Sequence, residues 1–173
     1  MQGCHGGVFG NDPVTLSEGL NKLVSEHIPL RENLQTLFSL CQKVEVEQGA
    51  LFGELVQEVK DFSTKLDYHS KREEDILFRM MEVYLGKNGG PIAVMEYEHE
   101  QAHGYISEFL KNVESHSEFS TDEKIKNANL IENAYHTLIS HFGKEEQVLY
   151  PMAERMFTDE EKEIVNQKVS VER

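Results

Sequence analysis

The sequence predicts an all-α protein, an up-down-up-down antiparallel four-helix bundle with a short C-terminal helix. Apolar residues recur at three- and four-residue steps over long stretches, and short segments with turn residues separate these stretches. Short connections make consecutive helices antiparallel neighbours. We expect a flexible N-terminal tail over residues 1–13, the bundle over 14–157, and a C-terminal helix and tail over 158–173.

Boundary signals place the first half of the bundle. The first helix is expected to begin near Thr15 or Ser17 and to end before Gly49. At Pro29 we expect a kink or a locally unpaired carbonyl but no end of the helix, since its apolar face resumes beyond the proline. The second helix should cover about residues 50–85, and the Gly- and Pro-containing segment 86–91 ends it. Two long helices joined by a tight turn are therefore predicted here.

The second half follows the same logic. The third helix is expected over about residues 92–115, and Ser120 with Glu123 forms a helix-start signature for the fourth, which should run to about Met156. Thr158 then caps a short terminal helix. All these elements are helical, so no strand is expected.

Composition limits the class of function. The chain has 173 residues and a net charge of −14, which argues against nucleic-acid binding, since phosphates require a basic surface. No stretch is long and apolar enough to cross a membrane, and the start lacks the features of a secretory signal. Cys4 and Cys41 form no disulfide framework, and Cys4 with His5 offers too few ligands to predict a site. We expect a cytoplasmic protein.

A pattern that occurs twice carries the chemical information. The segments that begin at His69 and His141 both consist of His, three other residues, two Glu, two further residues, Leu and an aromatic residue. On a helix the Glu four residues after the His lies about 40° away on the same face, while the next Glu points about 140° away, toward solvent or a second shell. Glu73 and Glu145 are thus the candidate ligands, although a shift by one residue would select Glu146.

Three more histidines lie on the apolar faces of the other helices. His27 belongs to the first helix, and His99 and His103 form an i, i+4 pair on the third. Each alone could be a core residue or a chance spacing. Counting residues from each turn, however, places the polar groups at one level of the bundle. The candidate metal ligands are His27, His69, Glu73, His99, His103, His141 and Glu145.

Such a set in an apolar core needs compensation, because each buried unsatisfied polar group costs about 1–3 kcal/mol. A metal removes this cost, and imidazole with carboxylate suits metals that accept both nitrogen and oxygen. Two divalent ions bridged by Glu73 and Glu145 would leave room for an oxo or hydroxo bridge and an open position. The lack of cysteine in the set argues against a structural zinc centre.

The arrangement resembles the hemerythrin-like (HHE cation-binding) family, over roughly residues 15–156. The family places His on the first helix, His-x-x-x-Glu on the second, His or His-x-x-x-His on the third, and His-x-x-x-Glu or His-x-x-x-x-Asp on the fourth. The resemblance implies a non-haem centre of two iron ions bridged by the two glutamates. It further implies one iron on His99, His103 and His141 and the other on His27 and His69.

Two departures concern function. Glu145 stands at i+4, where oxygen-carrying hemerythrins have Asp at i+5. Some relatives in iron–sulfur repair carry a cysteine-containing N-terminal domain, whereas this sequence has Cys4 and His5 on the expected short tail. We therefore expect a di-iron protein that binds O2 or NO as carrier, sensor or detoxifier. The alternative is a di-iron enzyme or an iron donor in iron–sulfur cluster repair.

Two further classes are weaker. A ferritin-like oxidase requires Glu-x-x-His on two helices, whereas both copies here, at Glu96 and Glu100, share one helix. A metal-free interaction bundle would leave the buried ligands unexplained. Glu98, Tyr97 and Tyr105 flank the third-helix histidines and are candidates for proton relays or for simple packing.

Overall fold

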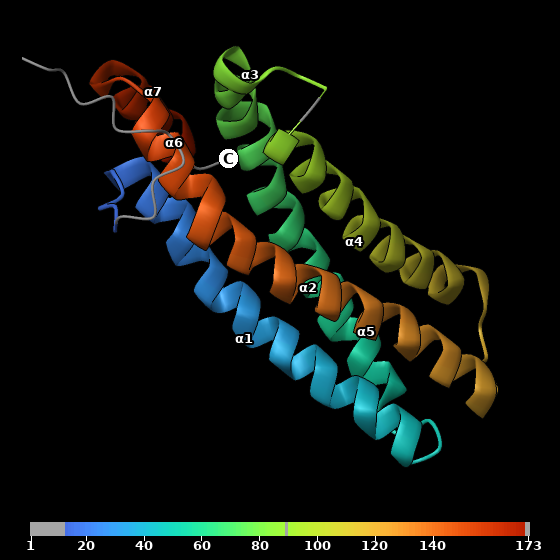
Figure 1. Ribbon diagram of the computed structural model, residues 1–173. Helices are drawn as coiled ribbons and strands as arrows, with labels where there is room; N and C mark the ends of the chain where they lie inside the picture. The colour runs from blue at the N-terminus through green and yellow to red at the C-terminus, as the bar shows by residue number, and fades with distance from the viewer. Residues whose placement is uncertain (1–12, 89, 172–173) are drawn as a thin grey trace, which may run out of the picture.

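The computed structural model describes residues 13–88 and 90–171, and this part of the chain is helical, without any strand (Figure 1). The all-α prediction is confirmed. The expected tail lies outside the described residues except for Pro13, and so do Cys4 and His5. Within the described residues, no helix is both long and apolar enough to span a bilayer.

The first two long helices follow their sequence signals. Helix α1 extends over Glu18–Val46 and continues through Pro29, whose side chain is exposed. The turn after α1 uses left-handed backbone at Gln48, Gly49 and Leu51, with φ values of 57°, 90° and 63°. Helix α2 then covers Phe52–Arg72. The predicted break at Gly49 is thus a real turn, and the glycine supplies one of its positive φ angles.

The predicted second helix is continuous but not uniform. After α2 the backbone forms a π-helical segment, η1, over Glu73–Phe78, and α3 follows over Arg79–Leu85. A π turn accommodates an extra residue, which changes the direction of the side chains relative to a regular helix. Such turns are frequent at functional sites, and η1 begins at a candidate ligand.

The second half repeats this irregularity. Helix α4 covers Gly90–Ser115, and α5 covers Thr121–Lys144 behind a capping box at Ser120. The π-helical segment η2, Glu145–Leu149, leads into α6, Tyr150–Met156. A second capping box, at Thr158, begins α7, Asp159–Val169. Both predicted N-terminal signatures are confirmed.

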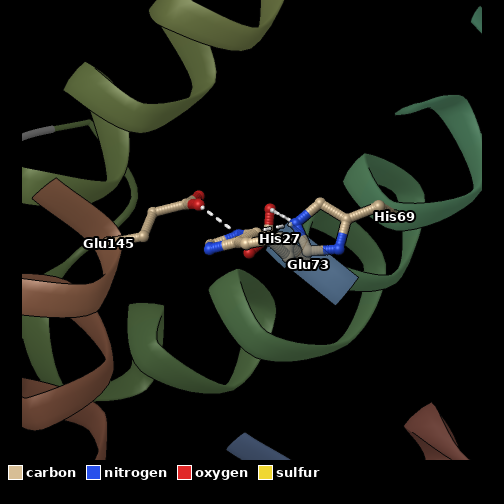
Figure 2. Close-up of side chains that lie close together, drawn as sticks. All are labelled: His27, His69, Glu73 and Glu145. Carbon is tan, nitrogen blue, oxygen red and sulfur yellow. Dashed lines mark hydrogen bonds and ion pairs between the residues drawn. The ribbon is translucent and has the colours of Figure 1, made fainter. Parts of the chain in front are cut away.

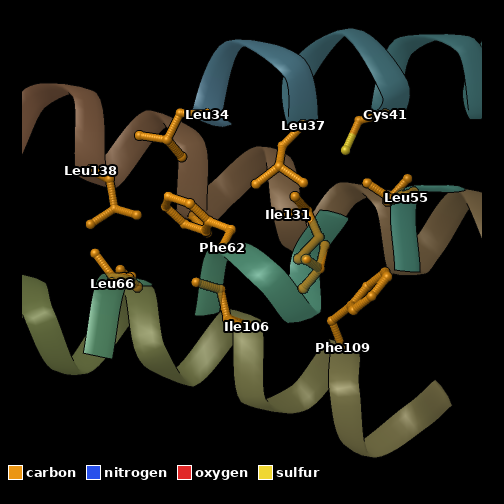
Figure 3. Close-up of a cluster of buried hydrophobic side chains, with 14 of the residues drawn as sticks. Leu34, Leu37, Cys41, Leu55, Phe62, Leu66, Ile106, Phe109, Ile131 and Leu138 are labelled. Atoms are coloured by element: carbon orange, nitrogen blue, oxygen red, sulfur yellow. The ribbon is translucent and has the colours of Figure 1, made fainter. Parts of the chain in front are cut away.

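The long helices pack around two apolar cores. Helix α1 packs against α2 and α5, α4 packs against α5 and α2, and α7 lies along α1 (Figure 1). The larger core, drawn in Figure 3, includes Leu34, Phe62, Ile106 and Leu138. We call the second cluster the end core; its members are Leu20, Leu23, Leu77, Phe78, Met81, Ile92, Met95, Leu149, Tyr150, Met152, Ala153, Phe157, Val165 and Val169.

Candidate metal centre

The polar residues of interest lie in the layer between the larger core and the end core. On α1, His27 stands between Leu23 of the end core and Leu30 of the larger core. Each of the other three chain segments shows the same order. The flanking pairs are Leu66 and Leu77 for His69 and Glu73, Met95 and Ala102 for His99, and Leu138 and Leu149 for His141 and Glu145. The helix periodicity thus places one polar band at one level.

Six of the seven predicted ligands form two overlapping groups of buried side chains. One group contains His27, His69, Glu73 and Glu145, whose side chains point toward one another in Figure 2. The other contains Glu73, His99, His141 and Glu145. In each group the ligand atoms all lie within 4.8 Å of one another. The two glutamates belong to both groups, so they lie between two pairs of imidazoles.

The contacts within the centre are short. Nε2 of His27 lies 3.1 Å from Nε2 of His69 and 3.1 Å from a carboxylate oxygen of Glu145. Glu73 Oε2 lies 3.4 Å from Nε2 of both His69 and His99. His141 Nε2 lies 2.8 Å from Glu145 Oε1 without forming a hydrogen bond. All four imidazoles therefore direct Nε2 toward the shared carboxylates.

Several of these atoms lack the partners that burial demands. Among the described residues, the buried side-chain atoms without a hydrogen-bond partner include Oε2 of Glu73, both carboxylate oxygens of Glu145 and Nε2 of His141. Each such atom costs about 1–3 kcal/mol if it stays unsatisfied. Their convergence on one point is what a cation site requires, because a bound cation would satisfy all of them together.

Each imidazole is held from behind by a carboxylate. The Nδ1 atoms of the four histidines lie within hydrogen-bond distance of a glutamate from another segment: 2.9 Å for His27 and Glu146, 2.7 Å for His69 and Glu26, 2.7 Å for His99 and Glu74, and 2.9 Å for His141 and Glu98. Since an ionised carboxylate only accepts, Nδ1 must carry the hydrogen, which leaves Nε2 available to a metal. This pattern is typical of histidine ligands.

Cations hold three of the four outer carboxylates. Arg31 donates to both oxygens of Glu146, at 2.6 and 2.8 Å, while Arg72 pairs with Glu26 and Lys144 with Glu98. The second Glu of each repeated motif, Glu74 and Glu146, thus belongs to this outer layer rather than to bulk solvent. The sequence left these two alternatives open. Glu98, a candidate proton relay, has the same role for His141.

The electrostatics of the centre favour positive charge. Burial and the charge of Glu145 raise the pKa of the Glu73 carboxyl, but the neighbouring imidazoles His69 and His99 lower it more, so the net shift is downward. Burial lowers the pKa of His99, whereas hydrogen bonds to Glu145, Glu73 and Glu74 raise it to about 11. Two ionised carboxylates in an apolar interior thus recruit protons onto imidazole when no cation is bound.

The sequence did not single out Tyr150, which adjoins the centre. Its fully buried hydroxyl donates to Oε1 of Glu73 and lies 3.3 Å from Nε2 of His27. The aromatic residue that ends each repeated motif is the signal that could have identified it. At Glu73, this contact satisfies the carboxylate oxygen that is not among the unpartnered atoms.

His103 lies apart from the two groups. Its side chain is 28% exposed, its Nδ1 lies 3.1 Å from Asp67, and its Nε2 lies 3.3 Å from Oγ of Ser70. The neighbouring Ala102 is the residue that α4 buries at this level. Tyr97 is exposed, and its hydroxyl accepts a hydrogen bond from Gln101. Tyr105 packs against the larger core.

The fold and the site together define a class: a helical protein whose interior holds imidazole and carboxylate side chains that are able to hold metal cations. The family model of the hemerythrin HHE cation-binding domain matches residues 18–165. The chain therefore belongs to this family, as the resemblance of its motifs predicted.

Individual proteins similar to this chain were also found. The chain is 32% identical over 139 residues to the protein named iron-sulfur cluster repair protein YtfE of Escherichia coli O157:H7, and equally to those of E. coli K12 (DH10B) and Shigella boydii serotype 18. Each alignment covers 76% of this chain and 62% of the relative. The matched part thus represents less than two thirds of these relatives. No solved structure matches the chain.

Proposed function

We propose that the protein is a di-iron protein of iron–sulfur cluster repair, which takes up two iron ions and donates iron to damaged clusters. One observation carries the proposal: two groups of buried His and Glu ligands share Glu73 and Glu145, whose oxygens are largely unpartnered. The similarity to relatives named for cluster repair supports this function over simple binding of a gas. The ionised, shared carboxylates suit two divalent cations rather than one.

The proposed architecture is an up-down-up-down antiparallel bundle with one ligand level. In this arrangement His27 and His69 hold one ion, and His99 and His141 hold the other. Glu73 and Glu145, which belong to both groups, would contribute carboxylate oxygens to both ions. A ligand role for His103 would require its ring to leave Asp67 and Ser70.

Bound iron would supply exchangeable ions and redox chemistry at this point. The protein's own residues do the rest. Glu26, Glu74, Glu98 and Glu146 fix the four imidazoles with Nε2 facing inward. The two apolar cores exclude bulk water above and below the layer. Tyr150 holds Glu73 by a hydrogen bond and so limits the rotation of that carboxylate.

A reconstitution assay tests the repair function. Fe2+-loaded protein is mixed anaerobically with an enzyme whose [4Fe–4S] cluster has lost one iron and been reduced to the [3Fe–4S]0 state, and recovery of the enzyme's activity and cluster absorption is followed. We expect faster recovery than with the same amount of free Fe2+, and no acceleration with Glu145→Ala. Equal rates for the loaded protein and free iron would refute repair by iron donation.

Binding of O2 or NO is the second candidate. An apolar groove of about 180 Å3 between α4 and the α5–η2 segment favours it, because apolar walls suit diatomic gases. Pro91, Val94, Met95, Lys144, Val148 and Leu149 line this groove. Met95 lies one helical turn from His99, and Leu149 one turn from Glu145.

Optical spectra of anaerobic, reduced protein test this second function. The sample is exposed separately to O2 and to NO. A new absorption band that is reversed by removal of the gas supports binding. Unchanged spectra with both gases would leave cluster repair as the remaining candidate function.

A further inference from the structure

The C-terminal helix α7 is closely seated on α1. A Cβ atom at Gly19 would lie 2.7 Å from the backbone nitrogen of Asn166 and 2.8 Å from its Cα, so only a glycine permits this approach. Lys22 donates to Oδ1 of Asn166 at 2.8 Å, and Val165 and Val169 are buried in the end core. The position of α7 is therefore tightly defined relative to the start of α1.

Arg72 connects this helix to the metal centre. Its Nη1 donates to the backbone carbonyl of Val169 at 2.6 Å, and its Nη2 pairs with Glu26. The guanidinium also lies over the ring of Tyr68, 4.1 Å from the ring centroid. Arg72 is 12% exposed in its side chain, so these contacts are shielded from solvent.

The same contacts continue to a ligand. Oε2 of Glu26 accepts from Nδ1 of His69 at 2.7 Å, and Nε2 of His69 faces His27 and Glu73 inside the centre. Val169, Arg72, Glu26 and His69 thus form one continuous series of polar contacts. A carboxylate that orients a histidine ligand is itself oriented by a guanidinium, and this guanidinium is anchored on α7.

The other outer carboxylates lack such a connection. Arg31 on α1 and Lys144 on α5 hold Glu146 and Glu98, and within the described part of the chain neither forms a hydrogen bond to α7. Glu74 receives its hydrogen bond from His99. Among the four clustered histidines, His69 is therefore the one joined to α7 by these polar contacts.

The surface around this connection is hollowed. Tyr68 and Arg72 line two hollows, one of about 270 Å3 and the other of about 410 Å3. The larger is also bordered by Val169 and Ser170, and the smaller by Lys168 and Val171. The hollows thus border the last turn of α7, although the side chain of Val169 itself is buried.

We propose that Arg72 is a positioning residue through which the seating of α7 sets the orientation of His69. This inference rests on the proposed metal-binding function, since it names the metal position that α7 controls. When α7 is correctly seated, the carbonyl of Val169 holds Arg72, Arg72 holds Glu26, and Glu26 fixes the ring of His69. When α7 is displaced, His69 loses its orientation while His27, His99 and His141 keep theirs.

Gly19→Ala and Arg72→Met test the proposal from its two ends. Gly19→Ala forces α7 away through the clash with Asn166, far from any ligand, and Arg72→Met removes the link itself. Gly53→Ala is the matched control, because Gly53 is also the second residue of a helix but its Cβ would meet nothing within 4 Å. Circular dichroism verifies that each full-length variant folds.

The readout is the long-range 1H–15N NMR spectrum of the histidine side chains, in metal-free and in Zn2+-loaded protein. We expect both variants to shift the His69 nitrogens in the same direction and more than those of the other three histidines, and Gly53→Ala to shift none. The double variant should shift His69 no further than Arg72→Met alone, since both act on one series of contacts. An unshifted His69 in Gly19→Ala, or equal shifts of all four histidines, would overturn the proposal.

A second measurement connects orientation to metal release. Loss of an outer partner of a metal-ligating histidine weakens metal binding roughly 10–100-fold. We expect a chelator to remove Fe2+ from Gly19→Ala and Arg72→Met at least several-fold faster than from wild type or Gly53→Ala. Release at the wild-type rate contradicts the proposal. Failure of the repair function alone is distinguishable, because the NMR comparison in metal-free protein requires neither iron nor a damaged cluster.

Discussion

Nδ1 of His27 and Oε1 of Glu146 lie 2.9 Å apart, although 119 residues separate them in the chain. Glu146 is the neighbour of Glu145, whose carboxylate faces the opposite way, into the centre. Adjacent glutamates therefore have different roles: one contacts the ligand atoms, and the other orients an imidazole from behind.

Substitution of these two glutamates should separate the roles. We expect Glu145→Ala to lose most of its metal, because Glu145 belongs to both groups of ligands. Glu146→Ala should weaken metal binding by about 10–100-fold, the usual effect of losing an outer partner. Metal content after dialysis measures both, and the exposed Gln147, substituted by Ala, is the control. An empty site in Glu146→Ala with a full one in Glu145→Ala would select the other glutamate as ligand.

We expect each chain to bind two metal ions and the bound ions to stabilise the fold. A ligand at a thousandfold excess over its Kd adds about 4 kcal/mol of stability when it binds the native state alone. For a chain of this size each kcal/mol raises Tm by about 2–4 °C, so saturation should raise Tm by roughly 8–16 °C. Elemental analysis and calorimetry with and without chelator provide the measurement. A single bound ion at saturation contradicts the shared-glutamate model.

His99 and His103 offer a direct comparison on one helix. We expect His99→Ala to lose metal from one of the two positions, whereas His103→Ala keeps both ions, because its ring contacts Asp67 and Ser70. Both variants replace a histidine by alanine, at positions one helical turn apart on α4, so each serves as the control for the other. Loss of metal from His103→Ala would assign it as a seventh ligand, as the family pattern suggested.

Cys41 should be chemically inert in the folded protein. Burial, together with the charge of Glu132, raises the pKa of its thiol to about 12, and the reactive thiolate is therefore scarce at neutral pH. In a Cys4→Ser background, a thiol reagent at pH 8 should label the native protein far more slowly than the unfolded protein. Since the thiol ionises only near its raised pKa, labelling should accelerate with rising pH. Rapid labelling of native protein at pH 8 would show that the side chain is accessible.

The sequence by itself determined the helices and the level of the ligands. Caps such as Ser120 and Thr158, breaks such as Gly49, and the apolar steps of each helix act locally, through backbone hydrogen bonds and burial of one face. These rules do not depend on how the helices meet. Spacing alone accordingly selected seven candidate ligands, and six of them lie in the two clusters.

Only the tertiary structure decided which groups meet around those ligands. The π turns at Glu73 and Glu145 change the side-chain directions that a regular helix, with 100° of rotation per residue, would give. The sequence contains no local pattern that predicts these π turns. The partners Glu26 and His69, Arg72 and Val169, and Tyr150 and Glu73 come from segments far apart in the chain. Their contacts depend on the rotation and spacing of packed helices, which composition and periodicity do not specify. The position of His103 has the same origin, since its ring contacts Asp67 and Ser70 on α2 and not the clustered atoms.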